Sequence, residues 1–220
     1  MKFLHIDKEQ LNSLVTSQLN SFFNDGSLVD GALLKKYQAD TIDRLHNCFT
    51  HIKKPYFFEN NKAIFNHLHS DHYAMYLYLL CNTIWKLDKN EKLASKVFLL
   101  NKALHGVDAF YGIDLPEIFL FVHPLGTVLG RAKYSDYFVV YQNCNVGANE
   151  DLIYPTFKGE TLLYSKATII GSCKVGSNTV FGANSFVMNT NIKDNSTVVG
   201  SYPNNKIIDN NKNVIDRMFN

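Results

Sequence analysis

Apolar residues in the first half of the chain recur at the spacing of an α-helix. The first stripe comprises Leu11, Leu14, Val15, Leu19 and Phe22. Three more run from Val29 to Ile52, from Ala74 to Leu87 and from Leu93 to Leu104. Residues three or four positions apart share one face of a helix, so each stripe predicts an amphipathic helix.

The ends of these stripes carry residues that favour helix termini. Ser70-Asp71 precedes the third stripe and predicts an N-cap, and Gly106 follows the fourth. Residues 53–61 include Pro55 and two adjacent asparagines, which is typical of a connecting loop. We therefore expect a helical domain over residues 1–106.

Downstream of Phe157 the apolar period changes to six residues. The first position of each hexad is aliphatic or aromatic, as in Phe157, Leu163, Ile169, Val175, Phe181 and Val187. The fifth position is small, as in Thr161, Ala167, Cys173, Thr179 and Ser185. A slip of one residue carries the pattern on to Ile192, and a less regular frame begins upstream at Val128.

A six-residue period predicts a parallel β-helix. Each hexad supplies a short strand and a corner, three hexads close one coil, and the apolar positions of successive coils stack on one another. The corners tolerate left-handed backbone best at asparagine or glycine, and the candidates are Asn178, Asn184, Asn189 and Asn195. A β-sandwich would show period-two alternation instead. We expect an α+β fold with the β-helix over residues 107–220.

One segment breaks the hexad frame. The interval from Val146 to Phe157 is longer than a hexad, which leaves residues 149–156 as a loop ejected from the β-helix. Loops on a regular scaffold often carry binding or catalytic residues, so we expect this loop to be functional.

Charge and cysteine usage narrow the class of protein. Twenty-two Lys+Arg against twenty Asp+Glu residues give a net charge of +2, which argues against a nucleic-acid binder. No apolar run reaches the ~18 residues of a membrane span, and the charged N-terminus does not resemble a signal peptide. The four cysteines lie far apart in sequence, which indicates reduced thiols and a cytoplasmic protein.

Three histidines close together invite a metal-site interpretation. His67, His69 and His72 are near one another, but only His69 and His72 would share a helical face. No acidic or thiol ligand completes the set, so we expect no metal.

His123 is the only histidine of the β-helical half, and it follows Asp114 and Glu117 in sequence. A neutral imidazole held by a carboxylate can take a proton from a hydroxyl or an amine. The alternative is a structural histidine that hydrogen-bonds across a coil corner. Residue type alone favours neither role.

Several of these segments together resemble serine acetyltransferases, a family of hexapeptide-repeat acyltransferases. The likeness is carried by Gly112–Pro116, His123–Gly126, Val128–Gly130, the loop ending in Tyr154-Pro155, and the hexads up to Gly200–Pro203. It is strong in the second half of the chain and weak in motifs in the first. The resemblance implies a left-handed β-helix, a homotrimer or a dimer of trimers, and acetyl-CoA lying in the groove between subunits.

The resemblance also implies roles for individual residues. His123 matches the family's general base. Asp114 matches the carboxylate that orients it, but its spacing to His123 is one hexad shorter than in the family, which leaves Glu117 as an alternative. The family's pantetheine contacts match Ala148, Ser165 and Ala183. Lys206 is the candidate partner of the CoA phosphates.

The acceptor side departs from the family pattern. Ile153-Tyr154 replaces an Arg-His pair of the loop, and Val122 replaces the acidic residue before the histidine. A serine carboxylate without its guanidinium would lose about 1.5–3 kcal/mol. Tyr154 offers a stacking face for a sugar ring, and Asp71 is a further candidate acceptor contact. We therefore expect acetylation of a sugar hydroxyl or amine in bacterial surface-polysaccharide biosynthesis.

Two other functions stay open. One is a true serine O-acetyltransferase of cysteine biosynthesis with a divergent loop, and the other is a non-catalytic β-helical scaffold. The family's usual partner, the next enzyme of the pathway, docks on a C-terminal tail that ends in isoleucine. This chain ends Arg217-Met-Phe-Asn220, which argues against that docking.

Overall fold

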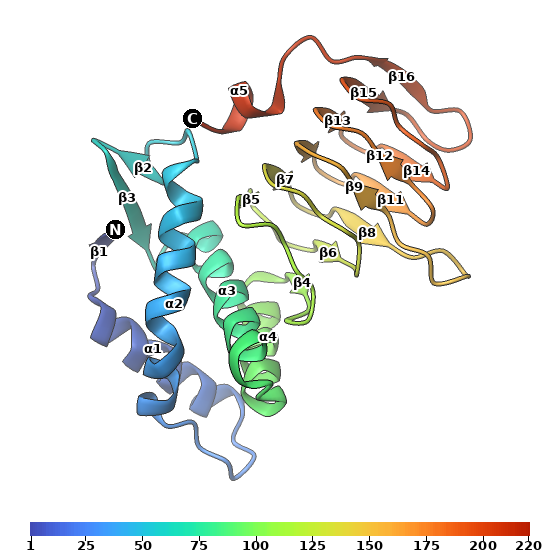
Figure 1. Ribbon diagram of the computed structural model, residues 1–220. Coiled ribbons are helices and arrows are strands. Elements are labelled where there is room, and N and C mark those ends of the chain that lie inside the picture. Colours follow the sequence, from blue (N-terminus) through green and yellow to red (C-terminus); the bar gives the residue numbers. More distant parts are fainter.

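The computed structural model describes residues 1–220 as a helical domain followed by a parallel β-helix (Figure 1). The four expected helices are confirmed: α1 (Lys8–Phe22), α2 (Gly31–Thr50), α3 (Ser70–Asp88) and α4 (Glu91–His105). Every residue of α3 from Asp71 to Ile84 is buried, and α3 packs on both α2 and α4. This helix is therefore the centre of the first half.

The helix termini follow the sequence at α4 but not at α3. Gly106 ends α4 in the left-handed conformation, with φ of +65°, as expected. The N-cap of α3 is His69, and not Ser70-Asp71. Asp71 lies instead in the first turn of the helix with its side chain buried.

The helical half also contains a small sheet that the sequence analysis missed. β1 (Lys2–Leu4) pairs in parallel with β3 (Lys62–Asn66), which pairs antiparallel with β2 (Phe58–Glu59). The expectation of a plain loop over residues 53–61 is wrong at its end. Asn60 and Asn61 both have positive φ, and asparagine at these two positions is a signal for a tight hairpin.

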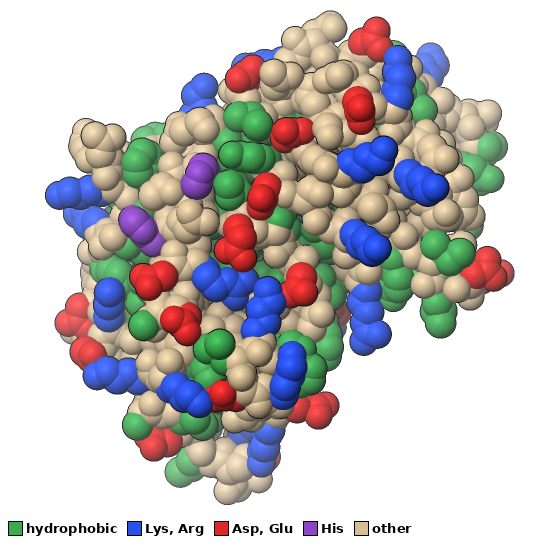
Figure 2. Space-filling view, in the orientation of Figure 1, with side chains coloured by type: hydrophobic (Ala, Val, Ile, Leu, Met, Phe, Trp, Pro, Cys, Tyr) green, Lys and Arg blue, Asp and Glu red, His purple; other side chains and the backbone are tan.

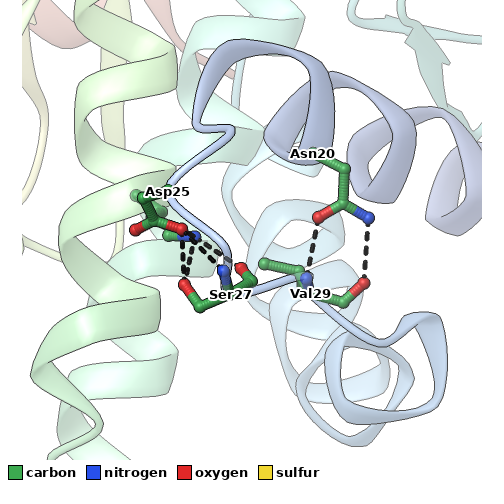
Figure 3. A network of polar contacts seen from close by, with 5 residues as sticks. Asn20, Asp25, Ser27 and Val29 are labelled. Atoms are coloured by element: carbon green, nitrogen blue, oxygen red, sulfur yellow. Dashed lines mark hydrogen bonds and ion pairs between the residues drawn. The ribbon is translucent and has the colours of Figure 1, made fainter.

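A lysine of α4 fixes the connection between α1 and α2. Lys96 is almost fully buried, and its Nζ donates to Asp25 Oδ1 at 2.9 Å and to Ser27 O at 2.8 Å. Figure 3 shows Asn20 bonded to both backbone groups of Val29 on the same connection. The loop thereby ties α1 to α4.

The β-helix has three faces. The first face consists of β5 (Phe119–Phe121), β7 (Phe138–Val140), β10 (Thr161–Leu163), β13 (Thr179–Phe181) and β15 (Ser196–Val199). The second face consists of β4 (Asp108–Ala109), β6 (Val128–Leu129), β8 (Asn145–Gly147), β11 (Thr168–Ile170) and β14 (Phe186–Met188). The third is short, with β9 (Thr156–Phe157) and β12 (Lys174–Val175). All these strands pair in parallel.

The hexad frame is confirmed from Phe157 onward. All the apolar first positions and all the small fifth positions named above are buried. The four corner asparagines all have φ between 48° and 60°. At the upstream start the frame is wrong by one residue, because Leu129 is buried where Val128 was expected and Val128 is 43% exposed. From Val140 and Val146 onward the upstream frame is confirmed, since both are buried and pair in register with Leu163 and Ile169.

The helical domain covers the first coil of the β-helix. α4 ends at His105 and β4 begins at Asp108. Helix α3 packs on β5, and Cys48 Sγ of α2 donates to Phe119 O at 3.0 Å. The first coil therefore has no free strand edge on the first face.

The C-terminal segment returns to the helical domain, and Figure 1 shows α5 leading to the C-terminal end of α2. β16 (Lys206–Asp209) pairs antiparallel with β15, and α5 (Val214–Met218) follows. Phe219 is buried against Tyr137, and Lys53 N donates to Met218 O at 3.0 Å. We call residues 210–220 the C-terminal strap.

Charges of both signs are spread over the face drawn in Figure 2, with several basic side chains over the β-helix. None of the helices combines the length and the apolar character that a membrane crossing requires.

Candidate functional site

The corners between the first and second faces of the β-helix stack in one row. They comprise residues 122–127, 141–144, 164–167 and 182–185, from the first coil to the fourth. We call this the open corner row, because the C-terminal strap does not contact it. The corners between the third and first faces, which include Tyr137, Asn178 and Asn195, form the strapped corner row.

His123 stands at the head of the open corner row. Its side chain is exposed, and it borders a hollow of about 200 Å³ that is also lined by Ser70, Leu104, His105, Pro124 and Leu125. The hollow thus lies between the helical domain and the first corner. His105 is uncharged at neutral pH, because burial lowers its pKa to about 4.

Asp71 is the carboxylate that contacts His123. Asp71 Oδ1 accepts the backbone N–H of His123 at 3.0 Å, across an interval of 52 residues, and Ser70 Oγ donates to the same oxygen at 3.2 Å. Burial raises the pKa of Asp71, while the nearby His69 and His123 oppose that shift. The expectation that Asp71 lies at the site is consistent with this position.

The histidines of the helical domain pack among aromatic rings. His69 and His72 stack with ring centroids 4.3 Å apart, and Tyr56 stacks on His69 at 5.1 Å. Burial lowers the pKa of His72 to about 3. Nowhere in residues 1–220 do three or more His, Cys, Asp or Glu side chains form a possible metal site.

The structure brings neither Asp114 nor Glu117 to His123. Asp114 is largely exposed and pairs with Lys86 at 3.0 Å. Glu117 borders a separate hollow with Arg44 and Lys86. The role of orienting carboxylate that the resemblance implied for these two residues is thus not supported in the single chain. The spacing from Asp114 to His123 is one hexad shorter than in the family, so the family's position for this carboxylate does not carry over directly.

The residues matched to pantetheine contacts divide between two corners. Ser165 and Ala183 lie on the open corner row, in the third and fourth coils. Lys206 pairs with Val199, directly before Gly200 at the same row's fifth corner. Ala148 lies instead where β8 ends, at the corner between the second and third faces.

The ejected loop leaves the β-helix at that second corner. The chain departs between β8 and β9, at residues 148–155, so Thr156 belongs to the coil and not to the loop. Leu152 of the loop is 76% exposed. The Tyr154 ring, in contrast, packs closely on Gly130, since a Cβ added to Gly130 would lie 2.8 Å from the ring. Tyr154 and His123 therefore lie on different corners of one chain. Val122 is partly buried beside His123.

The cysteines are unsuited to nucleophilic catalysis. All four are free and buried. Burial raises the pKa of the Cys144 thiol to about 11 and also raises that of Cys173. A covalent acyl-cysteine step has no candidate among them.

Sequence reasoning missed the helical-domain side of the hollow, which Ser70, Leu104 and His105 form. These residues belong to α3 and α4, and no local motif links them to His123. Only the packing of the two halves brings them together.

The chain is similar in sequence to serine acetyltransferases, although no protein-family model matches it. The serine acetyltransferase of Bacillus subtilis is 26% identical over 146 residues, which cover 64% of this chain and 66% of that protein. That of Synechococcus elongatus is 29% identical over 105 residues, which cover 46% and 43%. The matched segments therefore span less than two thirds of these curated relatives.

Solved structures of serine acetyltransferases share the fold over nearly the whole chain. A complex with CoA has a TM-score of 0.68 at 16% identity, with 93% of this chain and 86% of that chain covered. The Neisseria gonorrhoeae enzyme in complex with serine has a TM-score of 0.69 at 20% identity, with 92% and 84% covered.

The fold and the open corner row define the class of this protein, a helical domain followed by a left-handed β-helix of hexapeptide repeats. Within that class, it is a serine acetyltransferase-like hexapeptide-repeat protein.

Proposed function

We propose that this protein is an acetyl-CoA-dependent O-acetyltransferase and that its acceptor is L-serine. The observation that carries the proposal is the position of His123. It lies at the head of the open corner row, against a buried carboxylate and beside a hollow that can admit a small acceptor. The similarity to enzymes named serine acetyltransferase supports serine over a sugar.

The geometry supports a direct transfer. The His123 imidazole takes the proton of the acceptor hydroxyl, and the hydroxyl oxygen attacks the thioester carbonyl. The new C–O bond forms, the C–S bond breaks, and the CoA thiolate leaves with the proton that the imidazole returns. A base of this kind contributes about 10²–10⁴-fold to the rate.

Acetyl-CoA supplies the acetyl group, and the open corner row is where we place its pantetheine arm. Ser165 and Ala183 are small side chains two and three coils from His123, or roughly 10 and 14 Å at the usual strand spacing. Lys206 lies beyond them on the same row and suits an anionic phosphate.

We propose a homotrimer as the working assembly. In one chain, Ala148 and the ejected loop lie one corner away from His123. A neighbouring subunit could place its own second-to-third corner against the open row and so complete the groove. We also propose that the protein acts in the cytoplasm, because its four cysteines are free and reduced thiols are typical of that compartment.

A sugar acceptor is the second candidate, and one observation favours it. The hollow beside His123 has no lysine or arginine in its lining, so the lining of the hollow in the single chain offers no such cation to pair a serine carboxylate. The stacking role expected of Tyr154 has less support, because its ring packs against Gly130.

The test is release of free CoA thiol from acetyl-CoA by the purified protein. L-serine is compared with nucleotide sugars and free amino sugars, and the products are weighed by mass spectrometry. We expect serine-dependent thiol release and an O-acetylserine product. A sugar-only product would support the second candidate, and no thiol release with any acceptor would overturn the enzyme assignment.

A further inference from the structure

The corner that carries His123 is longer than its equivalents in later coils. Six residues (122–127) separate β5 from β6, whereas four separate β7 from β8, β10 from β11 and β13 from β14. Val122 N donates to Val140 O just as Tyr141 N donates to Leu163 O, so these two residues are equivalent. Asn143 N donates to Leu125 O, which makes Leu125 equivalent to the residue that directly follows Tyr141 in the regular corner.

His123 and Pro124 are therefore the two inserted residues. They form a bulge on an otherwise regular row, and His123 adopts a left-handed conformation with φ of +48°. A residue with a Cβ pays a steric cost for that conformation, so surrounding contacts must hold it. The His123 carbonyl accepts a hydrogen bond from Leu125 N at 2.7 Å, within the bulge itself.

The contact from outside the bulge comes from Asp71. The His123 N–H has Asp71 Oδ1 as its hydrogen-bond acceptor. Asp71 is only 2% exposed and sits in the first turn of α3, where a negative charge is favoured by the helix dipole. Because α3 is buried along most of its length, this carboxylate is held at a fixed place.

We propose that Asp71 is the positioning residue of His123. By accepting the His123 N–H, its carboxylate holds the two-residue bulge in the conformation that aims the imidazole at the hollow. This inference rests on the proposed function for its catalytic consequence, but the backbone contact can be measured without any substrate. It differs from the earlier expectation that Asp71 binds the acceptor.

A second aspartate provides a matched control. Asp136 Oδ1 accepts the backbone N–H of Ile118 at 3.0 Å, at the opposite end of the same strand β5. Both carboxylates thus accept one backbone N–H next to β5. Only Asp71 acts on the residue proposed as the base, so the two sites separate positioning from general stabilisation.

The experiment compares D71A and D71N with D136A and D136N in the acetyl-transfer assay. A misplaced catalytic group can cost about 100-fold, so we expect D71A to lower kcat by about 100-fold with both KM values within about threefold of wild type. D71N keeps an oxygen that accepts the N–H, and we expect its kcat within about fivefold of wild type. D136A lowers the melting temperature but leaves kcat within about twofold.

Amide hydrogen exchange at His123 gives a readout independent of activity and of the proposed function. We expect protection in wild type and D71N and rapid exchange in D71A, with folding of each variant checked by its melting curve. Wild-type exchange at His123 in D71A would overturn the proposal. So would a kcat of D71A within threefold of wild type, or a rise in acceptor KM shared by D71N and D71A. Protection at His123 without any acetyl transfer would leave the contact intact and count against the proposed function.

Discussion

Two corner rows of the same β-helix have similar backbones and different surroundings. The open corner row leaves Ala183 exposed and Ser165 half-buried, with the exposed His123 at its head. The strapped corner row is covered by the C-terminal strap, whose Val214 and Phe219 are buried against it. Both rows use left-handed asparagines, Asn184 in one and Asn178 in the other. The repeat alone therefore does not determine which row is used for binding.

What differs is the segment laid against each row. On the strapped row, Asn178 Oδ1 accepts the N–H of Val214 at 2.9 Å, and its Nδ2 donates to Asn195 and Asn213. On the open row, the Asn184 side chain makes no hydrogen bond within the chain. At the head of the open row the helical domain makes the Asp71–His123 bond, and Gly106 O accepts the N–H of Gly126 at 3.0 Å. The comparison teaches that non-repeating segments assign roles to equivalent corners.

The largest expected effect comes from the head of the open row. H123A removes the proposed base, and we expect acceptor-dependent thiol release to fall about 10³-fold, while the melting curve and the oligomeric state stay as in wild type. The measurement is the initial rate at saturating acetyl-CoA. A rate within tenfold of wild type would remove His123 from the mechanism and leave the open row without a reactive group.

The next largest effect is expected on the strapped row. N178A removes a buried hub of hydrogen bonds and places alanine at φ of +51°, so we expect a loss of about 2–4 kcal/mol in the free energy of unfolding. The matched control is N184A, which carries the same left-handed cost without the bonds and should lose about 1–2 kcal/mol. Urea unfolding measures both. Equal losses would mean that the strap contributes nothing at this corner.

Much of the fold, though not the contrast between the two rows, could be predicted from the sequence, because the hexad period is local. A repeating apolar position and a small fifth position fix the inside of every coil from Phe157 onward, and the corner asparagines follow from backbone sterics. The four helices follow likewise from the 3.6-residue period. The small sheet was missed because β2 and β3 are short and because β3 also pairs with the distant β1.

The site was only partly predictable from the sequence, because it too depends on contacts between residues far apart in the chain. His123 could be singled out by residue type and by resemblance. Its carboxylate partner could not, because Asp71 is 52 residues away and reaches it only through the packing of α3 on β5. Asp114 and Glu117 are nearer in sequence but lie on other sides of the coil. Proximity along a solenoid chain is a poor guide to contact, because a few residues turn the chain onto another face.

A smaller effect should follow from filling the open row. A183W places a bulky ring on the path proposed for pantetheine, and we expect the KM for acetyl-CoA to rise about tenfold, or about 1.4 kcal/mol, with little change in kcat. The control is K158W, an exposed position directly after β9 and away from the open corner row. Steady-state kinetics with acetyl-CoA varied gives both constants. An unchanged KM in A183W would place the cofactor elsewhere and remove the functional contrast between the rows.

The smallest effect concerns the hollow that the helical domain adds to the open row. Burial holds the pKa of His105 at about 4 in the folded chain, below its usual 6.5. Between these values the unfolded chain binds a proton that the folded chain does not. Stability is therefore fully present above pH 6.5 and is lost as the pH falls toward 4.

Replacing His105 should flatten that dependence. H105Q keeps a polar group near Asn101, which lies 2.9 Å from the His105 ring nitrogen, and it removes the titration. We expect its unfolding free energy to decline less steeply than that of wild type from pH 6.5 to 4.5, as measured by urea unfolding. Part of the decline should remain, because His72 is buried in the same sense. H5Q, which replaces an exposed histidine, is measured alongside as the control. Identical slopes for H105Q and wild type would mean that His105 is freely protonated, so that the hollow beside His123 would carry a positive charge in acid and suit an anionic acceptor.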